Sequence, residues 1–290
     1  MRIAPRDLLP ALTTAALLAS PGAAHPGSGI VADREGHVYF MDTGAGVWKL
    51  DTHGALTQHP GPRFHWMTID PDNRFAKTPM PAVSGGEIAR SGASPTLLLA
   101  SDSPLAMSRD GDLVYPSPAG KDAVQILKMT PKGQSSVLAR LKVPWVNGLA
   151  AGPDGSLYVT EDRAIRKIDK QANVATVVEG IAVTGCVSIP GNEEENGPYL
   201  RGLDVDAQGT IFVAAAGCGS VLKVTADGRA TTLLQIQAPW SPTAVVRVGG
   251  DLYVLEYLHV ATEDRRAWIP RIRKISADGK QTIVATVERS

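Results

Sequence analysis

The chain has 290 residues, 43% of them hydrophobic and 20% charged, so it can bury a core and is too polar for a membrane protein. Lys plus Arg and Asp plus Glu both number 29, and this balance excludes a basic nucleic-acid binder. The 29 Gly and 21 Pro exceed what a helical bundle tolerates, because Gly costs helix entropy and Pro removes a backbone donor. The composition predicts a turn-rich β protein.

The N-terminus has the pattern of a cleavable secretory signal. Arg2 and Arg6 precede an apolar stretch over 8–20, and Pro21-Gly22-Ala23-Ala24 follows it. At about 1.5 Å per residue this stretch reaches only about 20 Å, short of the roughly 30 Å hydrocarbon core. We therefore predict a signal peptide over 1–24 and a secreted or periplasmic protein, not held in a membrane after cleavage.

A repeat organises the rest of the chain. Segments that begin at Gly29, Gly148 and Gly202 align without gaps, and each has the pattern strand, tight turn, strand. A Gly stands where the hairpin needs positive φ, and alternating β-branched or aromatic residues follow. The predicted turns, of which the one at Asp72-Asn73 is the weakest, lie at positions 36, 73, 111, 155, 209 and 250. Their spacing brackets the period of a four-stranded propeller blade and predicts six blades.

Each of several hairpins is followed by a further strand in which apolar residues alternate with Lys or Arg. These strands are expected over 46–51, 164–169, 220–225 and 271–276. Such strands have one apolar face and one solvent-exposed face, so a blade must stack on its neighbours to bury its apolar face. No helical run of ten residues separates the strands, which disfavours a βαβ fold. We predict an all-β, six-bladed β-propeller of four-stranded antiparallel blades, forming a single domain over 25–290.

The repeat G-hydrophobic-x-x-D-x-x-G-x-hydrophobic-Tyr-Val, followed by a Lys-Ile-Asp strand, resembles the NHL repeat. Residues 28–288 as a whole are similar to the six-bladed superfamily that includes SMP-30/gluconolactonase-like and streptogramin lyase-like proteins. The resemblance implies the fold. It does not select an activity, because that superfamily includes hydrolases, a lyase, synthases and binding platforms.

Strand direction defines a search space for a site. The residue before each blade's first strand and the residue that ends its second strand should lie on one face, around the channel mouth. The first ring contains Ser28, His65, Ser103, Asn147, Arg201 and Pro242. The second ring contains Asp42, Pro79, Ser117, Glu161, Ala215 and Glu256.

Asn147 is the most suggestive ring member. In SMP-30-like lactonases a Glu, an Asn in an Asn-Gly pair and an Asp in an Asp-Gly pair hold a divalent metal, and Asn147-Gly148 matches the Asn element. The Asp element aligns with Arg201-Gly202 and the Glu element with Ser28 or Gly27, so one ligand of three is present. An Arg beside a metal would repel the cation. The alternative role for Asn147 is to cap the start of a strand.

Three carboxylates of the second ring, Asp42, Glu161 and Glu256, form another possible site. With the Asn147 carbonyl they could supply oxygen ligands for a divalent cation, calcium or magnesium. The alternative is structural, because an acid at this repeat position commonly accepts hydrogen bonds from the next turn. The six His show no zinc-binding spacing.

Arg201 and His65, if both face the mouth, would attract a carboxylate or a phosphate, since guanidinium is a planar donor fork. The alternative is an ion pair between Arg201 and Glu193, Glu194 or Glu195. No G-x-S-x-G elbow occurs, so serine-based hydrolysis is unsupported.

Two long connections are expected at the same face, over 184–200 and 257–270. The second carries the charged and aromatic residues of a possible lid or partner patch, namely Tyr257, His259, Arg265, Arg266 and Trp268. Cys186 and Cys218 are the only cysteines. In an oxidising compartment we expect them to form a disulfide that pins the first connection; two separate thiols are the alternative.

Two function classes stay open. One is an exported binding propeller that holds a small anionic ligand or a protein loop at its mouth, with His65, Asn147, Arg201, Glu161 and Glu256 as ligand-binding candidates. The other is a metal-dependent hydrolase, lactonase-like or esterase-like, with a rearranged ligand set whose candidates are Asp42, Asn147, Glu161 and Glu256. We favour the first and expect a monomer.

Overall fold

The computed structural model describes residues 26–83, 86–186, 197–260 and 264–289. The predicted signal peptide over 1–24 and the acidic residues Glu193, Glu194 and Glu195 lie outside these ranges. Within them, no helix is both long enough and apolar enough to cross a membrane.

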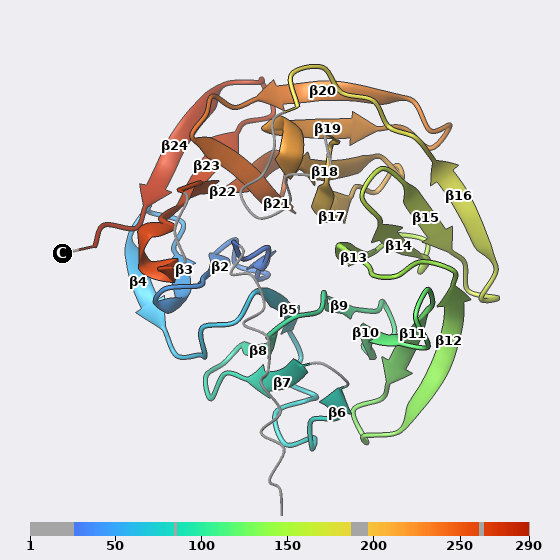
Figure 1. Cartoon of the computed structure of the whole chain (residues 1–290). Coiled ribbons are helices and arrows are strands. Elements are labelled where there is room, and N and C mark those ends of the chain that lie inside the picture. The colour runs from blue at the N-terminus through green and yellow to red at the C-terminus, as the bar shows by residue number, and fades with distance from the viewer. Residues whose placement is uncertain (1–25, 84–85, 187–196, 261–263, 290) are drawn as a thin grey trace, which may run out of the picture.

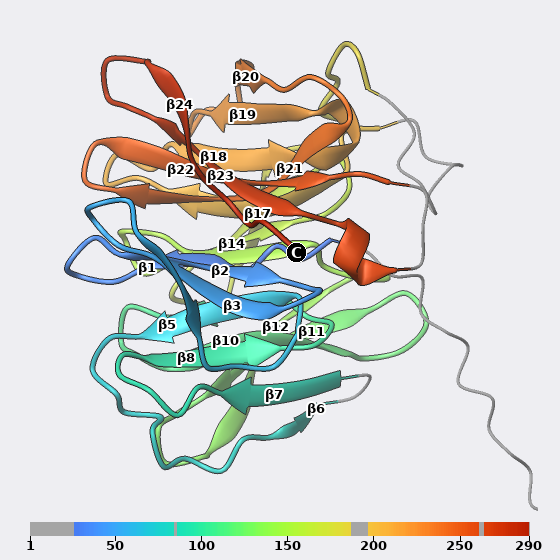
Figure 2. The same ribbon diagram turned by 90° about the vertical axis from the view of Figure 1, so that its left-hand side faces the viewer.

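Six four-stranded antiparallel sheets surround a central axis like the blades of a propeller (Figure 1). The predicted fold class is therefore confirmed. The first strand of each blade lies nearest the axis and the last sheet neighbour lies at the rim. Figure 2 shows the ring from its side, with the turn between the first two strands of the first blade on the left.

The strands follow the chain blade by blade. Blade 1 contains β1 (Ile30–Ala32), β2 (Val38–Asp42), β3 (Gly46–Leu50) and β4 (Leu56–His59). Blade 2 contains β5 (Trp66–Asp70), β6 (Ala82–Val83), β7 (Gly86–Arg90) and β8 (Thr96–Ala100). Blade 3 contains β9 (Ala106–Met107), β10 (Leu113–Pro118), β11 (Val124–Met129) and β12 (Ser135–Leu141).

The second half of the ring is built in the same way. Blade 4 contains β13 (Gly148–Ala151), β14 (Leu157–Thr160), β15 (Ile165–Ile168) and β16 (Val174–Val178). Blade 5 contains β17 (Leu200–Val205), β18 (Ile211–Ala215), β19 (Ser220–Val224) and β20 (Ala230–Gln235). Blade 6 contains β21 (Trp240–Val248), β22 (Asp251–Leu258), β23 (Pro270–Ile275) and β24 (Gln281–Thr286). Two 3₁₀ turns, η1 (Ala216–Cys218) and η2 (Arg265–Ala267), join the second and third strands of blades 5 and 6.

Glycines hold the tight turns as the repeat predicted. Gly36 and Gly155 have φ of +87° and +79°, a region that side chains with a Cβ avoid. In blade 6 the positive φ, +60°, belongs to Gly249 and not to the predicted Gly250. The hairpins therefore form where the local sequence demands them, which also sets the direction of every strand that follows.

Blade 2 departs from the prediction. The strand β5 pairs with β8, not with the segment directly after the Asp72-Asn73 turn, so the sheet order is β5-β8-β7-β6. Asn73 does form a turn with φ of +53°, but its side-chain oxygen accepts a hydrogen bond from the Thr96 amide at 2.8 Å. The chain after β5 thus crosses to the rim and returns inward. The second-ring assignment of Pro79 was wrong, and Ser101, directly after β8, takes that place.

The core lies between neighbouring blades. Ile165 of blade 4, for example, packs in one cluster with Leu203 and Leu222 of blade 5. Phe40 of blade 1 packs in another with Leu255 and Ile272 of blade 6, which closes the ring. We call the face at which the first strands begin and the second strands end the mouth face. It carries η1 and η2, and in Figure 1 it faces the viewer.

Candidate functional site

The mouth face gathers the polar ends of the first strands. Ser28, His65, Asn147 and Arg201 are each at most 8% exposed and lie within two residues of the start of a first strand. Ser28, Asn147 and Arg201 are each followed by Gly, because the backbones of neighbouring first strands approach closely there. A Cβ at Gly148 would lie 2.4 Å from the Arg201 carbonyl oxygen. The Gly residues thus let the backbones of neighbouring blades approach closely at the mouth.

Arg201 is the most deeply buried cation of this face, 4% exposed. Its Nη2 donates to the Pro26 carbonyl oxygen at 2.9 Å. Its guanidinium carbon lies 5.8 Å from the ring centroids of both Trp66 and Tyr199, where aromatic faces stabilise a cation. Burial lowers the pKa of Arg201, although an arginine stays protonated in proteins. The result is a fixed positive charge framed by two rings.

Two histidines share this environment. His65 has its Nδ1 against the carbonyl oxygen of Ser101, and burial lowers the pKa of its ring. His259 follows β22, and burial, with the charge of Arg201 next in importance, lowers its pKa to about 4. Its Nε2 is buried and has no hydrogen-bond partner in the described part of the chain. Both rings are therefore neutral at physiological pH, and Arg201 supplies the permanent charge.

Asn147 is held by a residue that the sequence analysis did not single out. Its Nδ2 donates to Oδ1 of Asp162 at 2.6 Å, and the indole N–H of Trp145 approaches the same oxygen at 3.4 Å. The backbone oxygen of Asp162 accepts from the Leu200 amide at 3.1 Å. Asp162 thus links blade 4 to the start of β17 beside Arg201.

The three second-ring carboxylates each pair with arginine. Asp42 is fully buried against Arg289, and Glu161 accepts from Arg166 Nε at 2.9 Å. Glu256, also fully buried, accepts from Nε of Arg271 at 2.6 Å and from Arg273. Pairs of this kind satisfy buried carboxylates without a metal.

These carboxylates do not gather at one point. Among the described residues, the one cluster of three Asp, Glu, His or Cys side chains with ligand atoms within 4.8 Å of one another is Asp33, Glu35 and His37. That cluster lies in the first hairpin turn, on the opposite face, where Asp33 accepts from the Glu35 and His37 amides. The structure therefore brings His65, Asn147 and Arg201 to one mouth and leaves Asp42, Glu161 and Glu256 in separate blades.

Two expectations about the connections have clear outcomes. Cys186 and Cys218 form a disulfide, as predicted. The connection that Cys186 begins ends at Tyr199, whose carbonyl accepts from the Ala216 amide of η1 at 3.1 Å. In the second connection Tyr257 and Trp268 are core residues of the junction between blades 6 and 1, so they cannot form a lid or partner patch.

Trp66, Tyr199 and Asp162 are the mouth residues that the sequence analysis missed. Trp66 and Asp162 each directly follow a ring residue, and Tyr199 precedes β17. That adjacency was the available signal. The contact of Trp66 with Arg201 joins blade 2 to blade 5 and depends on how the blades are arranged, whereas Asp162 meets Asn147 within blade 4 and Tyr199 lies two residues before Arg201.

A cavity of about 250 Å³ lies along the axis below this mouth. The first strands of all six blades line it, and Ser28 and Trp66 stand at its wall. Arg201 does not itself line the cavity, but its guanidinium lies over the ring of Trp66, which does.

The sequence matches no protein-family model and no curated protein. Solved structures share its fold. Regucalcin, a calcium-binding protein from Agrobacterium tumefaciens, is 18% identical with a TM-score of 0.57 over 79% of this chain and 81% of its own. A protein assigned as a gluconolactonase is 18% identical with a TM-score of 0.54 over 90% of each chain. Virginiamycin B lyase from Staphylococcus aureus is 15% identical with a TM-score of 0.51 over 91% of this chain and 85% of its own.

At these identities the likeness concerns the fold. The chain has the six-bladed propeller architecture that SMP-30/gluconolactonase-like proteins share with virginiamycin B lyase. Calcium binding and lyase activity are properties of those proteins, because a fold does not determine the chemistry of its site.

Proposed function

We propose that this protein is an exported β-propeller that binds a small anionic ligand at its channel mouth. One observation carries the proposal: Arg201, a 4% exposed cation framed by Trp66 and Tyr199, lies over the ring of Trp66, which lines the axial cavity. A guanidinium offers a planar donor fork to carboxylate or phosphate, and a low-dielectric surrounding strengthens that attraction. The other first-ring candidates are Asn147, at the start of the adjacent blade, and His65, which directly precedes Trp66.

Export is supported by two independent features. The segment over 1–24 has the pattern of a secretory signal. The Cys186–Cys218 disulfide is compatible with an oxidising compartment outside the cytosol. If the full-length chain is expressed in a secreting bacterial host, the mature protein should be recovered outside the cytoplasm and should begin after Ala24. Uncleaved protein that still begins at residue 1 and stays in the cytoplasm would contradict export.

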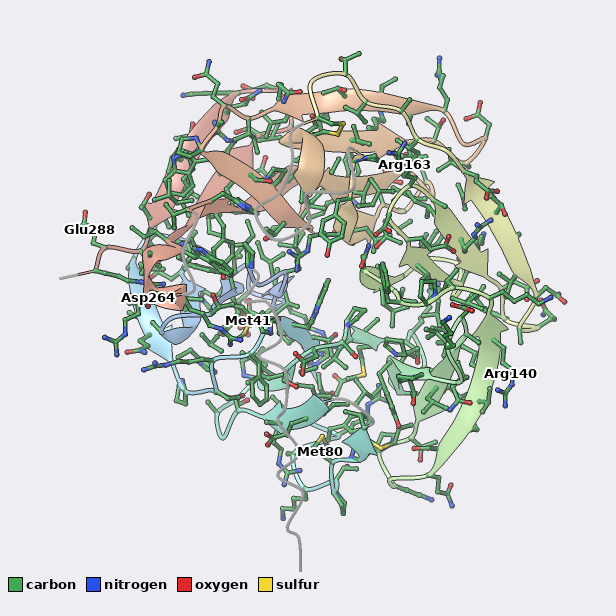
Figure 3. The ribbon with its side chains drawn as sticks, in the orientation of Figure 1. Met41, Met80, Arg140, Arg163, Asp264 and Glu288 are labelled. Atoms are coloured by element: carbon green, nitrogen blue, oxygen red, sulfur yellow. A yellow bond between two sulfur atoms is a disulfide. The ribbon has the colours of Figure 1, made fainter. Side chains whose placement is uncertain are left out.

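The binding proposal is tested with a panel of small carboxylates and inorganic phosphate on purified protein, by calorimetry and thermal shift. Arg201→Gln should weaken binding about tenfold or more, because a hydrogen bond to a charged group contributes about 1.5–3 kcal/mol. Arg201→Lys keeps the charge and should lose less. The matched control is Arg140→Gln, at an exposed position on β12 that lies at the outer rim in Figure 3.

Two outcomes would decide against the proposal. Equal affinity of the wild type and Arg201→Gln for every anion, with both proteins folded, would remove Arg201 from the site. Turnover of lactones or esters that stops on chelation would favour the metal-dependent hydrolase instead.

A further inference from the structure

The axial cavity extends the mouth site downward, and its lining indicates what a ligand must look like beyond its charged group. Resting on the proposed function, we propose that the ligand is a linear aliphatic monocarboxylate. Its carboxylate meets Arg201 at the mouth, and its hydrocarbon chain enters the cavity along the propeller axis.

The upper end of the cavity carries the polar groups. Trp66 lines the cavity wall, and its ring also lies against Arg201. The guanidinium carbon of Arg201 is 5.8 Å from the centroid of the Trp66 ring. Ser28 lines the same end, and its amide donates to the His65 carbonyl oxygen at 2.7 Å. Arg201 Nη2 donates to the carbonyl oxygen of Pro26, two residues before Ser28, so a carboxylate held by Arg201 would lie near Ser28.

The Ser28 hydroxyl is available to donate a hydrogen bond to a ligand. It is 4% exposed, and its Oγ has no hydrogen-bond partner within the described ranges. A buried hydroxyl without a partner is costly, so such groups are normally satisfied by protein, water or ligand. A carboxylate oxygen at the mouth would accept this hydrogen bond while the other oxygen meets the guanidinium.

Below Ser28 the wall is largely aliphatic. Val31, Ile69, Met107, Leu149 and Leu203 contribute to it from five different blades. The volume is about 250 Å³. Since one water molecule occupies about 30 Å³ of liquid, the space holds on the order of eight groups of that size, which a methylene resembles. An alkyl chain gains free energy by leaving water for such a wall.

A carboxyl group in the wall sets a limit on the far end of the ligand. Asp204 lines the cavity, and its oxygens accept from the Val205 amide at 2.8 Å and the Arg247 amide at 2.7 Å. Burial raises the pKa of this carboxyl, and the two hydrogen bonds only partly oppose that rise. A second carboxylate at the end of the ligand would meet this acidic group away from water. The cavity therefore favours a monocarboxylate over an α,ω-dicarboxylate of the same length.

The test is calorimetry of the mature protein with acetate, butyrate, hexanoate and octanoate. Affinity should rise about fourfold per methylene, the equivalent of about 0.8 kcal/mol for each buried methylene, until the chain fills the cavity. Adipate and suberate should bind at least tenfold more weakly than hexanoate and octanoate. Hexan-1-ol, which lacks the charge, should bind at least tenfold more weakly than hexanoate.

Variants locate the chain within the cavity. Val31→Phe narrows the wall and should reduce the gain per methylene while leaving acetate binding within twofold. Val137→Phe, at a position 48% exposed on β12, is the matched control and should leave the whole series unchanged. Both variants are compared with the wild type by circular dichroism to show that they fold.

The outcomes separate this inference from the proposed function. If every chain length binds equally and Arg201→Gln weakens all of them, the mouth site stands and the aliphatic chain is ruled out. If Arg201→Gln changes no affinity, the proposed function fails. If affinity rises with chain length equally in wild type and Val31→Phe, the chain binds elsewhere and this inference is wrong.

Discussion

The guanidinium of Arg289 pairs with the buried carboxylate of Asp42, 247 positions earlier in the chain. Arg289 Nη1 also contacts the carbonyl oxygens of Arg265 and Arg266 in η2. Beside this pair, the Tyr257 hydroxyl donates to the Met41 carbonyl oxygen at 2.6 Å. Each described blade is built from strands that are consecutive in the chain, so no sheet joins the two ends of the repeat. Side chains at the junction of blades 6 and 1 perform that task.

Breaking this pair should destabilise the ring. Arg289→Gln leaves the Asp42 carboxylate buried without its counter-ion, which typically costs about 3–5 kcal/mol. Urea unfolding of the two single variants and of Arg289→Gln combined with Asp42→Asn measures the coupling, and the double variant should recover part of the loss.

The surface pair of Arg34 and Asp72, 2.9 Å apart with both side chains largely exposed, is the control. Arg34→Gln should cost less than about 1 kcal/mol. A similar cost for Arg289→Gln would show that the ring closes without this contact.

Removing the disulfide should lower stability. The Cys186–Cys218 bond closes a loop with a sequence separation of 32, for which the chain-entropy estimate is about 3–4 kcal/mol. Cys186→Ser with Cys218→Ser should therefore unfold at lower urea concentration than the wild type. Thiol titration of denatured, unreduced wild-type protein should find no free thiol; two free thiols would refute the bond.

Acid should destabilise the protein through His259. Burial lowers its pKa to about 4 in the folded state, below the ordinary value of 6.5. Between these values the unfolded chain binds more protons than the folded one, so stability falls as the pH drops from 6.5 towards 4. The full effect is on the order of 3 kcal/mol. His259→Gln should lose less stability than the wild type over this range in thermal melts at several pH values.

The exposed His53 provides the comparison for this effect. His53→Gln should retain the acid sensitivity of the wild type. If His259→Gln and the wild type lose equal stability between pH 6.5 and 4, the acid sensitivity arises elsewhere.

The turn that opens blade 2 depends on Asn73. Its φ is +53°, and its Oδ1 accepts from both the Thr96 amide and the Thr96 hydroxyl, at 2.8 and 2.9 Å. Asn73→Ala loses these bonds, and Ala tolerates the left-handed region less well than Asn, whose short polar side chain can hydrogen-bond locally; the cost should be about 2–4 kcal/mol. Asn73→Gly loses the same bonds without the backbone strain and should cost less. Denaturant unfolding of both variants measures the difference in stability. Equal losses of stability in the two variants would contradict a cost of the left-handed backbone conformation at residue 73.

Chelation should leave the melting temperature unchanged. Asp42, Glu161 and Glu256 pair with arginines, and Arg201 places a positive charge at the mouth. A divalent cation is disfavoured near such charges. Thermal melts with EDTA, and then with added calcium or magnesium, check this expectation. A lower melting temperature in EDTA that Asn147→Ala reproduces would restore the metal interpretation.

The repeat made the blades predictable because its signals are local. A Gly such as Gly36 or Gly155 sets a hairpin by its own φ, and the alternation beside it sets which face is buried. Because this hairpin pattern recurs along the chain, it predicts a closed ring of blades. The Cys pair was predictable for a related reason, since strand direction alone brings both connections to one face.

Only the tertiary structure decided which partners each polar side chain meets. Asp42 looked like a ligand in the sequence, yet its partner Arg289 comes from the far end of the chain. Arg201 became a candidate by its ring position, whereas Trp66 and Tyr199 reach it from another blade and from a connection. A local pattern determines backbone conformation through φ and strand alternation. The environment of a buried charge depends on contacts between distant segments, which form only when the six blades close.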